Sequence, residues 1–231
     1  MTANKTQNKP SSPLMRPTIQ FLVATGLFVA AVLASREAPL TNWEKELFQL
    51  IYGWPGFLWL PFVIVTQMGS VYAFALLTAF YTITRRYRAA IEIVLAGTLA
   101  YVVSGVAKEL WGRVRPHDIL PDVISLEFSV YGPGFPSGHT ALATALLLTA
   151  MHHLPRQYRW LPIVGIIGVG LSRVYLGVHA PLDIIGGFAI GWSMYALVRR
   201  IQYSSAAAAK SRAQRHPLYK NTIGRLSQTK S

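Results

Sequence analysis

Six long apolar stretches, separated by short polar segments, constrain the fold of this chain more than any other feature of its sequence. They cover residues 18–34, 58–83, 91–107, 140–154, 161–178 and 182–198. A helix that crosses a bilayer needs roughly 17–25 mostly apolar residues, so these stretches are candidate transmembrane helices. The fourth and fifth are the weakest candidates, because alone they also suit buried helices of a soluble bundle. We predict an all-α fold, a polytopic membrane helical bundle with six transmembrane helices.

The composition agrees with a membrane protein. Hydrophobic residues make up 52% of the 231 residues and charged residues only 13%, about half of the ~25% typical of soluble domains. A net charge of +13 by itself suggests nucleic acid or an anionic membrane surface as a partner. The apolar content excludes intrinsic disorder and favours the membrane, so no nucleic-acid partner is expected. The absence of cysteine excludes a disulfide scaffold, a thiol nucleophile and thiolate metal sites.

The distribution of positive charge predicts the orientation of the helices. With six alternating spans and a cytoplasmic N-terminus, 16 of the 22 Lys and Arg residues fall on the cytoplasmic side. Cytoplasmic loops carry an excess of Lys and Arg, so we expect both termini to be cytoplasmic. The chain then divides into a polar N-terminus (1–17), a six-helix membrane domain (18–198) and a basic cytoplasmic tail (199–231). The first span also resembles a signal peptide, and its cleavage is left open.

Three polar clusters fall on the predicted outer side of the membrane. The first contains Lys108 and Arg115, which are seven residues apart and share one face of a helix that continues from the third span. Pro116 then favours an exit from the helix. Two cations on one face suit an anionic ligand, although such residues also snorkel at ordinary helix ends.

The second cluster is a turn rich in Gly and Pro, directly before the fourth apolar stretch. Ser137 is a candidate N-cap residue, which leaves the backbone N–H groups of Gly138 and His139 at a helix N-terminus. Unsatisfied donors at a helix N-terminus bind anions, and the His139 ring is close enough to reach the same anion. The alternative is an ordinary cap with an incidental histidine.

The third cluster contains Arg173, His179 and Asp183. His179 and Asp183 are four residues apart, so their side chains meet if the last helix begins near Pro181. A carboxylate on one ring nitrogen fixes the imidazole tautomer and makes the other nitrogen more basic, as in an activated nucleophile. The pair could instead only close a helix end, but the nearby Arg173 favours a functional site.

These clusters lack the grouped carboxylates that would hold a pair of magnesium ions. We therefore expect a phosphate chemistry without a metal and without a cofactor. The remaining charged residues of this side are interpreted as solvated loop charges that could also shape access for a substrate: Glu109, Arg113, Asp118, Asp122 and Glu127.

Together, Lys-x6-Arg-Pro, Pro-Ser-Gly-His and Ser-Arg-x5-His-x3-Asp resemble the three-part signature of the phosphatidic acid phosphatase type 2 superfamily. All the fixed positions are present, over residues 108–183. The resemblance implies that His179 attacks phosphorus and becomes a phosphohistidine, and that Asp183 orients it. It implies that His139 protonates the leaving oxygen and later helps to activate water. The implied phosphate-binding groups are Lys108, Arg115, Ser137, Gly138 and Arg173.

The resemblance implies an integral membrane lipid phosphatase whose partners are a lipid phosphate and membrane lipids. Undecaprenyl diphosphate is the first-choice substrate; phosphatidylglycerophosphate, phosphatidate and lipid A phosphates are alternatives, as is phosphoryl transfer to a lipid acceptor. In a bacterium, the site would face the periplasm from the inner membrane. The membrane spans disfavour a vanadium-dependent haloperoxidase, which shares the anion-binding signature. The complete set of His139, His179 and Asp183 disfavours a catalytically silent lipid-binding protein. The oligomeric state is left open.

Overall fold

The computed structural model describes residues 14–127 and 131–215, and this part of the chain is helical without any strand. Its α-helices are α1 (Met15–Ser35), α2 (Asn42–Tyr52), α3 (Trp59–Thr66), α4 (Val71–Ile83), α5 (Tyr87–Trp111), α6 (Pro116–Ile119), α7 (Gly138–His153), α8 (Leu161–Tyr175) and α9 (Pro181–Arg215). Short 3-10 turns lie at Gly56–Leu58, Gln67–Gly69 and Arg156–Tyr158. The all-α prediction is confirmed for the described residues.

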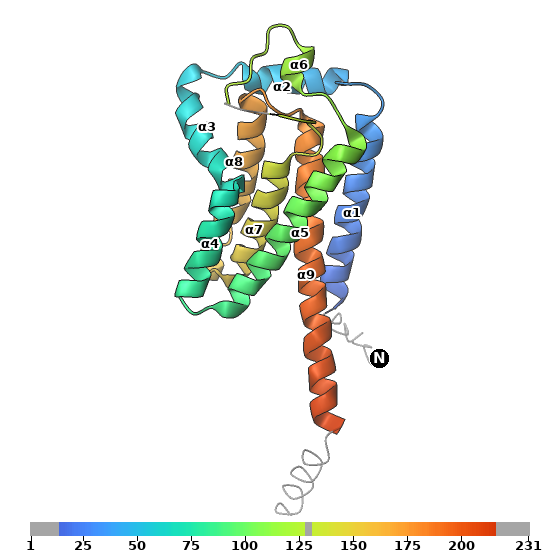
Figure 1. Cartoon of the computed structure of the whole chain (residues 1–231), viewed down its shortest axis with the longest axis vertical. Helices are drawn as coiled ribbons and strands as arrows, with labels where there is room; N and C mark the ends of the chain where they lie inside the picture. The colour runs from blue at the N-terminus through green and yellow to red at the C-terminus, as the bar shows by residue number, and fades with distance from the viewer. Residues whose placement is uncertain (1–13, 128–130, 216–231) are drawn as a thin grey trace, which may run out of the picture.

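The long helices form one bundle in which α7 is the most enclosed (Figure 1). Helix α7 packs against α5, α8 and α9, and α9 also packs along α1 and α5. Gly187 and Gly191 lie one turn apart on the face of α9 that meets α7. A Cβ atom at these positions would collide with the backbone carbonyls of Ser137 and Ala141, respectively. Small residues spaced by four let two helix backbones approach closely, as in membrane proteins.

Each of the six predicted ranges contains helix, but the second is broken into α3 and α4. The break is the turn Gln67–Gly69, and Ser70 then caps α4 by accepting a hydrogen bond from the backbone N–H of Ala73. A Cβ atom at Gly69 would collide with the backbone carbonyl of His139. The break therefore lets the chain touch the N-terminus of α7, a contact that hydropathy alone does not reveal.

Helix α2 was not predicted, because its sequence mixes charged and apolar residues. Its N-terminus carries a capping box, in which Thr41 and Glu44 satisfy each other's backbone donors. Phe48 and Ile51 are buried on one face, whereas Leu50 is exposed on the other. Figure 1 shows α2 lying across the same end of the bundle as α6.

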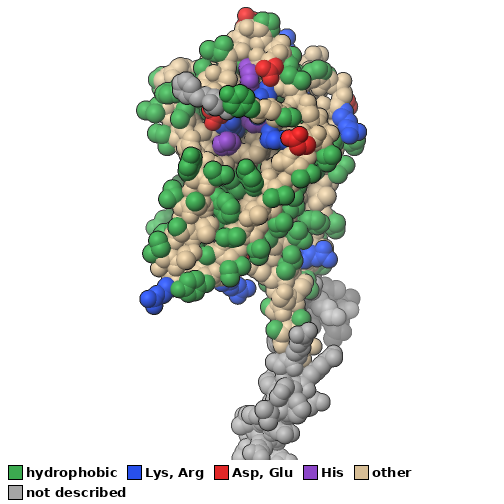
Figure 2. Space-filling view, viewed as in Figure 1, with side chains coloured by type: hydrophobic (Ala, Val, Ile, Leu, Met, Phe, Trp, Pro, Cys, Tyr) green, Lys and Arg blue, Asp and Glu red, His purple; other side chains and the backbone are tan. Residues whose placement is uncertain are grey.

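Large apolar side chains cover the sides of the bundle, which suits a hydrocarbon environment (Figure 2). Among the described residues, three helical segments are long and apolar enough to cross a membrane: Met15–Ser35, Tyr87–Ile119 and Pro181–Ala209. The pair Asn42–Tyr52 and Gly56–Gly69 passes the same test only together, and it is bent by 86°. The chain is thus an integral membrane protein with three or four candidate spans by length and composition.

The predicted end of the last span at residue 198 does not coincide with a helix end, because α9 continues to Arg215. Likewise, α1 begins at Met15, inside the predicted N-terminal segment. Residues 1–13 and 216–231, which make up the rest of both predicted terminal segments, lie outside the described residues. The predicted division into a membrane domain and tails stays a prediction.

The contact between α7 and α9 gives a direct test of this packing. Gly191→Ala forces a Cβ atom into the Ala141 carbonyl, so the two backbones must move apart. Overpacking of this kind costs about 1–3 kcal/mol, and we expect a lower Tm in detergent. Gly26→Ala is the matched control, because Gly26 lies in α1 with open space where its Cβ would be. An equal Tm for both variants would contradict the packing described here.

Candidate active site

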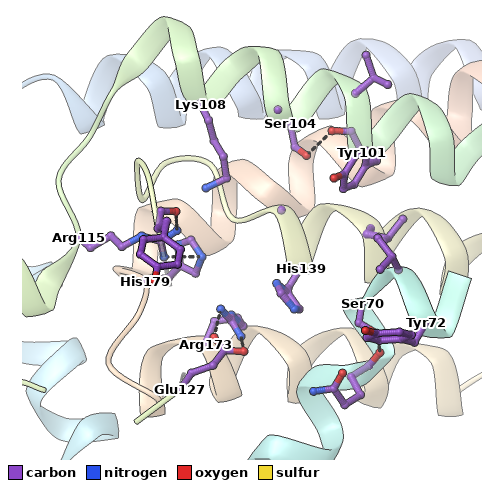
Figure 3. A pocket seen from close by; sticks show the side chains of 18 residues that line it. Ser70, Tyr72, Tyr101, Ser104, Lys108, Arg115, Glu127, His139, Arg173 and His179 are labelled. Atoms are coloured by element: carbon purple, nitrogen blue, oxygen red, sulfur yellow. Dashed lines mark hydrogen bonds and ion pairs between the residues drawn. The ribbon is translucent and has the colours of Figure 1, made fainter. Parts of the chain in front are cut away.

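The three polar clusters meet at the end of the bundle that α2 and α6 cover. Backbone hydrogen bonds join them: Gly134 N–H donates to the Arg113 carbonyl (2.6 Å), and Ser137 N–H donates to the Asp183 carbonyl (2.9 Å). A cavity of about 580 Å³ opens between them. The predicted site residues that line it are Lys108, Arg115, Gly138, His139, Arg173 and His179, and Figure 3 shows how their labelled side chains surround one space.

The first cluster comes from the C-terminal end of α5 and the segment after it. Gly112, with φ of +51°, ends the helix in a left-handed conformation that glycine adopts without strain. Lys108 Nζ donates to the Pro133 carbonyl (2.7 Å). Arg115 Nε donates to the Gly132 carbonyl (2.8 Å), and its Nη1 donates to the Val178 carbonyl (2.8 Å). Backbone carbonyls thus fix both cations at the cavity wall.

The second cluster confirms the predicted N-cap. The Ser137 hydroxyl accepts hydrogen bonds from the backbone N–H of Thr140 (3.5 Å) and from its hydroxyl (3.0 Å), and α7 begins at Gly138. Ser137 is completely buried and does not line the cavity, so its role as a phosphate ligand stays a prediction. Gly138 and His139 do line the cavity, from the N-terminal turn of α7, where backbone donors attract anions.

The third cluster holds the predicted histidine–carboxylate pair. A turn at Gly177, with φ of +78°, reverses the chain between α8 and α9 and leaves His179 just before the N-terminus of α9. His179 Nδ1 lies 3.3 Å from Asp183 Oδ2, and the same oxygen accepts the Ala180 N–H (2.9 Å). Both side chains are buried; His179 reaches the cavity, whereas Asp183 stays behind it.

Neighbouring groups define the tautomer of His179. Arg115 Nη1 lies 3.4 Å from His179 Nε2 and can only donate, so this contact requires a lone pair on Nε2. The ring proton is then on Nδ1, where it is donated to Asp183. Burial, followed by the charges of Arg115, Lys108 and Arg173, lowers the pKa of His179 well below its usual range. The ring is therefore neutral and its Nε2 carries no proton, as a nucleophile requires.

Arg173 comes from the end of α8 and pairs with Glu127. Its Nη1 donates to Glu127 Oε1 (2.9 Å), and its Nη2 lies 2.6 Å from Oε2. Burial raises the pKa of Glu127, but its hydrogen bond to Arg173 and the surrounding cations lower it overall. Glu127 lines the cavity, so its interpretation as a solvated loop charge was wrong. The Nε of Arg173 is buried without a hydrogen-bond partner among the described residues, which leaves a donor for a ligand.

Arg113 was also interpreted as a solvated loop charge, and it is buried instead. It binds Asp183 Oδ1 through Nη1 (3.1 Å) and Glu44 through both terminal nitrogens (3.0 and 2.6 Å). Sequence reasoning missed Glu44 altogether, because it lies 69 residues from Arg113. Its capping box, Thr41-x-x-Glu44, was the only local signal, and that signal predicts a helix start and not a site.

No group of three or more His, Cys, Asp and Glu side chains that could hold a metal ion occurs within residues 14–127 and 131–215. The carboxylates near the cavity are each paired with an arginine, Glu127 with Arg173 and Asp183 with Arg113. The expectation of a metal-independent chemistry stays a prediction.

The low pKa of His179 predicts how stability depends on pH. An unfolded histidine binds a proton below about pH 6.5, whereas folded His179 stays neutral to a lower pH. The folded state therefore loses stability as the pH falls below about 6.5, by up to about 1.4 kcal/mol per pH unit for one proton. We expect His179→Asn to reduce this pH dependence of Tm between pH 6.5 and 5. The same slope in both proteins would contradict a neutral, buried His179.

Comparison with known proteins places this cavity in a family. The family model of the PAP2 superfamily matches residues 89–206, about half of the chain and all three clusters. The undecaprenyl-diphosphatase of Sulfolobus acidocaldarius is 32% identical over 155 residues, which cover 65% of this chain and 74% of the relative. The lipid A 1-phosphatase of Rhizobium etli is 28% identical over 81% of this chain and 82% of the relative.

The crystal structure of a PAP2-type phosphatidylglycerolphosphate phosphatase from Bacillus subtilis has the same fold. It aligns with a TM-score of 0.63 and 25% identity, over 81% of this chain and 96% of that one. The match of the family model over the three clusters, together with these relatives, confirms the resemblance that the motifs indicated. The chain belongs to the PAP2 superfamily.

Proposed function

We propose that this PAP2 phosphatase hydrolyses the terminal phosphate of a membrane lipid, with undecaprenyl diphosphate as its first-choice substrate. The observation that carries the proposal is the His179 Nε2 lone pair, which faces a cavity lined by Lys108, Arg115 and Arg173. Phosphoryl transfer depends mainly on positioning and on stabilising negative charge at the equatorial oxygens. Three cations and the N-terminus of α7 supply that stabilisation.

The proposed reaction has two steps. His139 takes up a proton from solvent when the phosphate anion binds beside it. His179 Nε2 then attacks phosphorus while the bond from phosphorus to the leaving oxygen breaks, and His139 gives that oxygen its proton. Asp183 stabilises the positive charge that develops on the His179 ring. Water then attacks the phosphohistidine, His139 takes a proton from the water, and the P–N bond breaks to release phosphate. General acid–base catalysis of this kind contributes about 10²–10⁴-fold.

The cavity also supports a lipid as the substrate. Beyond the polar groups, its wall continues down α4 and α5 along Val71, Tyr72, Tyr101, Val102 and Gly105. Tyr72 and Tyr101 are exposed on the side of the bundle, and Figure 2 shows His and Lys or Arg side chains in a hollow surrounded by apolar ones. A lipid could place its phosphate at the cations while its apolar chain leaves sideways, between α4 and α5.

The finer membrane topology belongs to the same proposal. Six helical segments alternate in direction, with α3 and α4 counted as one, which supports six spans (Figure 1). The connection between α4 and α5 contains Arg85 and Arg86, and the first turn of α5 contains Arg88. This end of the bundle lies away from the cavity. By the positive-inside rule, that end and both termini would be cytoplasmic. The cavity would then face the exterior, which is the periplasm if the membrane is a bacterial inner membrane.

Phosphate release by the purified protein tests the proposal. Undecaprenyl diphosphate, phosphatidylglycerophosphate, phosphatidate and lipid A are compared in detergent with EDTA present. We expect release from undecaprenyl diphosphate to be fastest, and His179→Ala to lower kcat by about 10³-fold or more, as loss of a nucleophile does. His152→Ala, at the far end of α7, is the matched control.

Several outcomes of this assay would contradict parts of the proposal. Wild-type rates in His179→Ala would exclude the proposed nucleophile. Activity that EDTA abolishes would exclude the metal-independent reaction. A faster reaction with another lipid would reassign the substrate, and phosphate recovered on a lipid acceptor would identify a phosphotransferase.

Glu127 predicts a separate effect on phosphate binding. Its carboxylate pairs with Arg173 in the cavity, where a phosphoryl group would need the same guanidinium. Glu127→Gln should lower the inhibition constant of inorganic phosphate about fivefold, equivalent to roughly 1 kcal/mol for a partly exposed ion pair. Asp122→Asn is the control, because Asp122 is exposed in the same segment. An unchanged or higher inhibition constant would show that Glu127 does not compete with phosphate.

A further inference from the structure

A chain of buried charges continues from His179 away from the cavity. His179 contacts Asp183, Asp183 contacts Arg113, and Arg113 contacts Glu44. Asp183 and Glu44 are completely buried, and Arg113 is 7% exposed. None of the three lies in the cavity wall, so phosphate binding does not explain their burial. Burying ions destabilises a fold unless partners compensate them, and here Arg113 pairs with both carboxylates.

Each nitrogen of the Arg113 guanidinium has a hydrogen-bond partner. Its Nη1 bridges Asp183 Oδ1 and Glu44 Oε1, at 3.1 and 3.0 Å, and its Nη2 lies 2.6 Å from Glu44 Oε2. Its Nε donates to the carbonyl of Pro39 (3.1 Å), in the segment between α1 and α2. An arginine guanidinium is not deprotonated in proteins, so Arg113 stays charged. Arg113 therefore contacts Asp183 with a fixed orientation and a full charge.

Glu44 is equally constrained, although it belongs to α2. Its Oε1 also accepts the backbone N–H of Leu182 (3.2 Å), in the first turn of α9. Its Oε2 also accepts the backbone N–H and the hydroxyl of Thr41, at 3.1 and 3.0 Å. One carboxylate thus joins α2, the segment after α5, and the N-terminus of the helix that carries Asp183.

We propose that Arg113 and Glu44 are positioning residues for the reaction at His179. Arg113 holds Oδ1 of Asp183, so that Oδ2 remains directed at Nδ1 of His179. Glu44 neutralises Arg113, so that Asp183 keeps its net negative charge towards the imidazole. This role rests on the proposed function of His179 as the nucleophile.

The role predicts an effect on kcat and not on substrate binding. Positive charge develops on the His179 ring only during the attack on phosphorus, so Asp183 acts mainly in the transition state. Without Glu44, the buried charge of Arg113 would oppose that stabilisation. Lys108, Arg115 and Arg173, which bind the ground-state phosphate, would be unaffected. An interaction made only in the transition state lowers kcat and kcat/KM equally when it is lost.

The test separates the charge of Glu44 from its shape. Glu44→Gln should lower kcat about tenfold or more, the scale expected for a misplaced catalytic group, with KM and the inhibition constant of inorganic phosphate within about twofold. Glu44→Asp restores the charge and should recover part of the loss. Glu46→Gln is the matched control, because Glu46 is exposed on the same helix. Rates are expressed per phosphate-binding site, so that unfolded protein does not enter them.

A double variant separates the electrostatic role from a structural one. In Glu44→Gln/Arg113→Gln, no unpaired charge remains beside Asp183, and the amide that replaces the guanidinium keeps an N–H donor for Oδ1. The kcat of this variant should therefore exceed that of Glu44→Gln alone. A purely structural role predicts the reverse order, because each substitution removes further hydrogen bonds. Losses in Tm and in affinity for inorganic phosphate that parallel the loss in kcat would also overturn the positioning role.

The same measurements distinguish this inference from the function on which it rests. Equal rates for wild type and His179→Ala would overturn the proposed nucleophile and the positioning role together. Wild-type kcat in Glu44→Gln, with His179→Ala inactive, would overturn the positioning role alone.

Discussion

Asp183 accepts hydrogen bonds from the Ala180 backbone N–H, the His179 imidazole and the Arg113 guanidinium, and it is completely buried. A buried carboxylate is stable only if hydrogen bonds and opposite charges compensate it. Each partner of Asp183 lies in a segment that must keep its position for the hydrogen bond to form. The start of α9, the turn at Gly177 and the segment after α5 are fixed in this way. The rest of the cavity depends on the same arrangement, because these segments also present Arg115 and His179.

Two of the three predicted phosphate-binding cations in the cavity donate hydrogen bonds to backbone carbonyls and not to acidic side chains. Lys108 and Arg115 donate to the carbonyls of Pro133, Gly132 and Val178, which orient them without cancelling their charge. Arg173 is the exception, since it is paired with Glu127. In the free protein, Lys108 and Arg115 are therefore oriented without an acidic partner among the described residues. An anion has to share Arg173 with Glu127 or displace Glu127 from it. This division suits a site that has to bind phosphate and also release it.

Most of the fold and most of the site were predictable from sequence, for different physical reasons. Hydropathy identified the six helical stretches because an apolar environment requires continuous apolar residues. The spacing of Lys108 with Arg115, and of His179 with Asp183, predicted residues that line the cavity or lie directly behind it, because both pairs are close in sequence. The break at Gln67–Gly69 was missed because it goes with a close tertiary contact to His139, which hydropathy does not report. Arg113 and Glu44 were misjudged or missed for the same reason: their partners are distant in sequence, and a charge in a polar segment looks solvated until the fold is known.

Glu44 lies outside residues 89–206, the region that the family model matches, yet it bonds directly to Arg113 and to the first turn of α9 within that region. The matched region is therefore not a self-sufficient module. A chimaera that joined residues 1–70 of a relative to the remainder of this chain would inherit all three sequence motifs intact. It would still bury Arg113 without one of its two carboxylate partners unless the donor supplied an acidic residue at the place of Glu44. The first third of the chain thus limits which recombination points are tolerated in this protein.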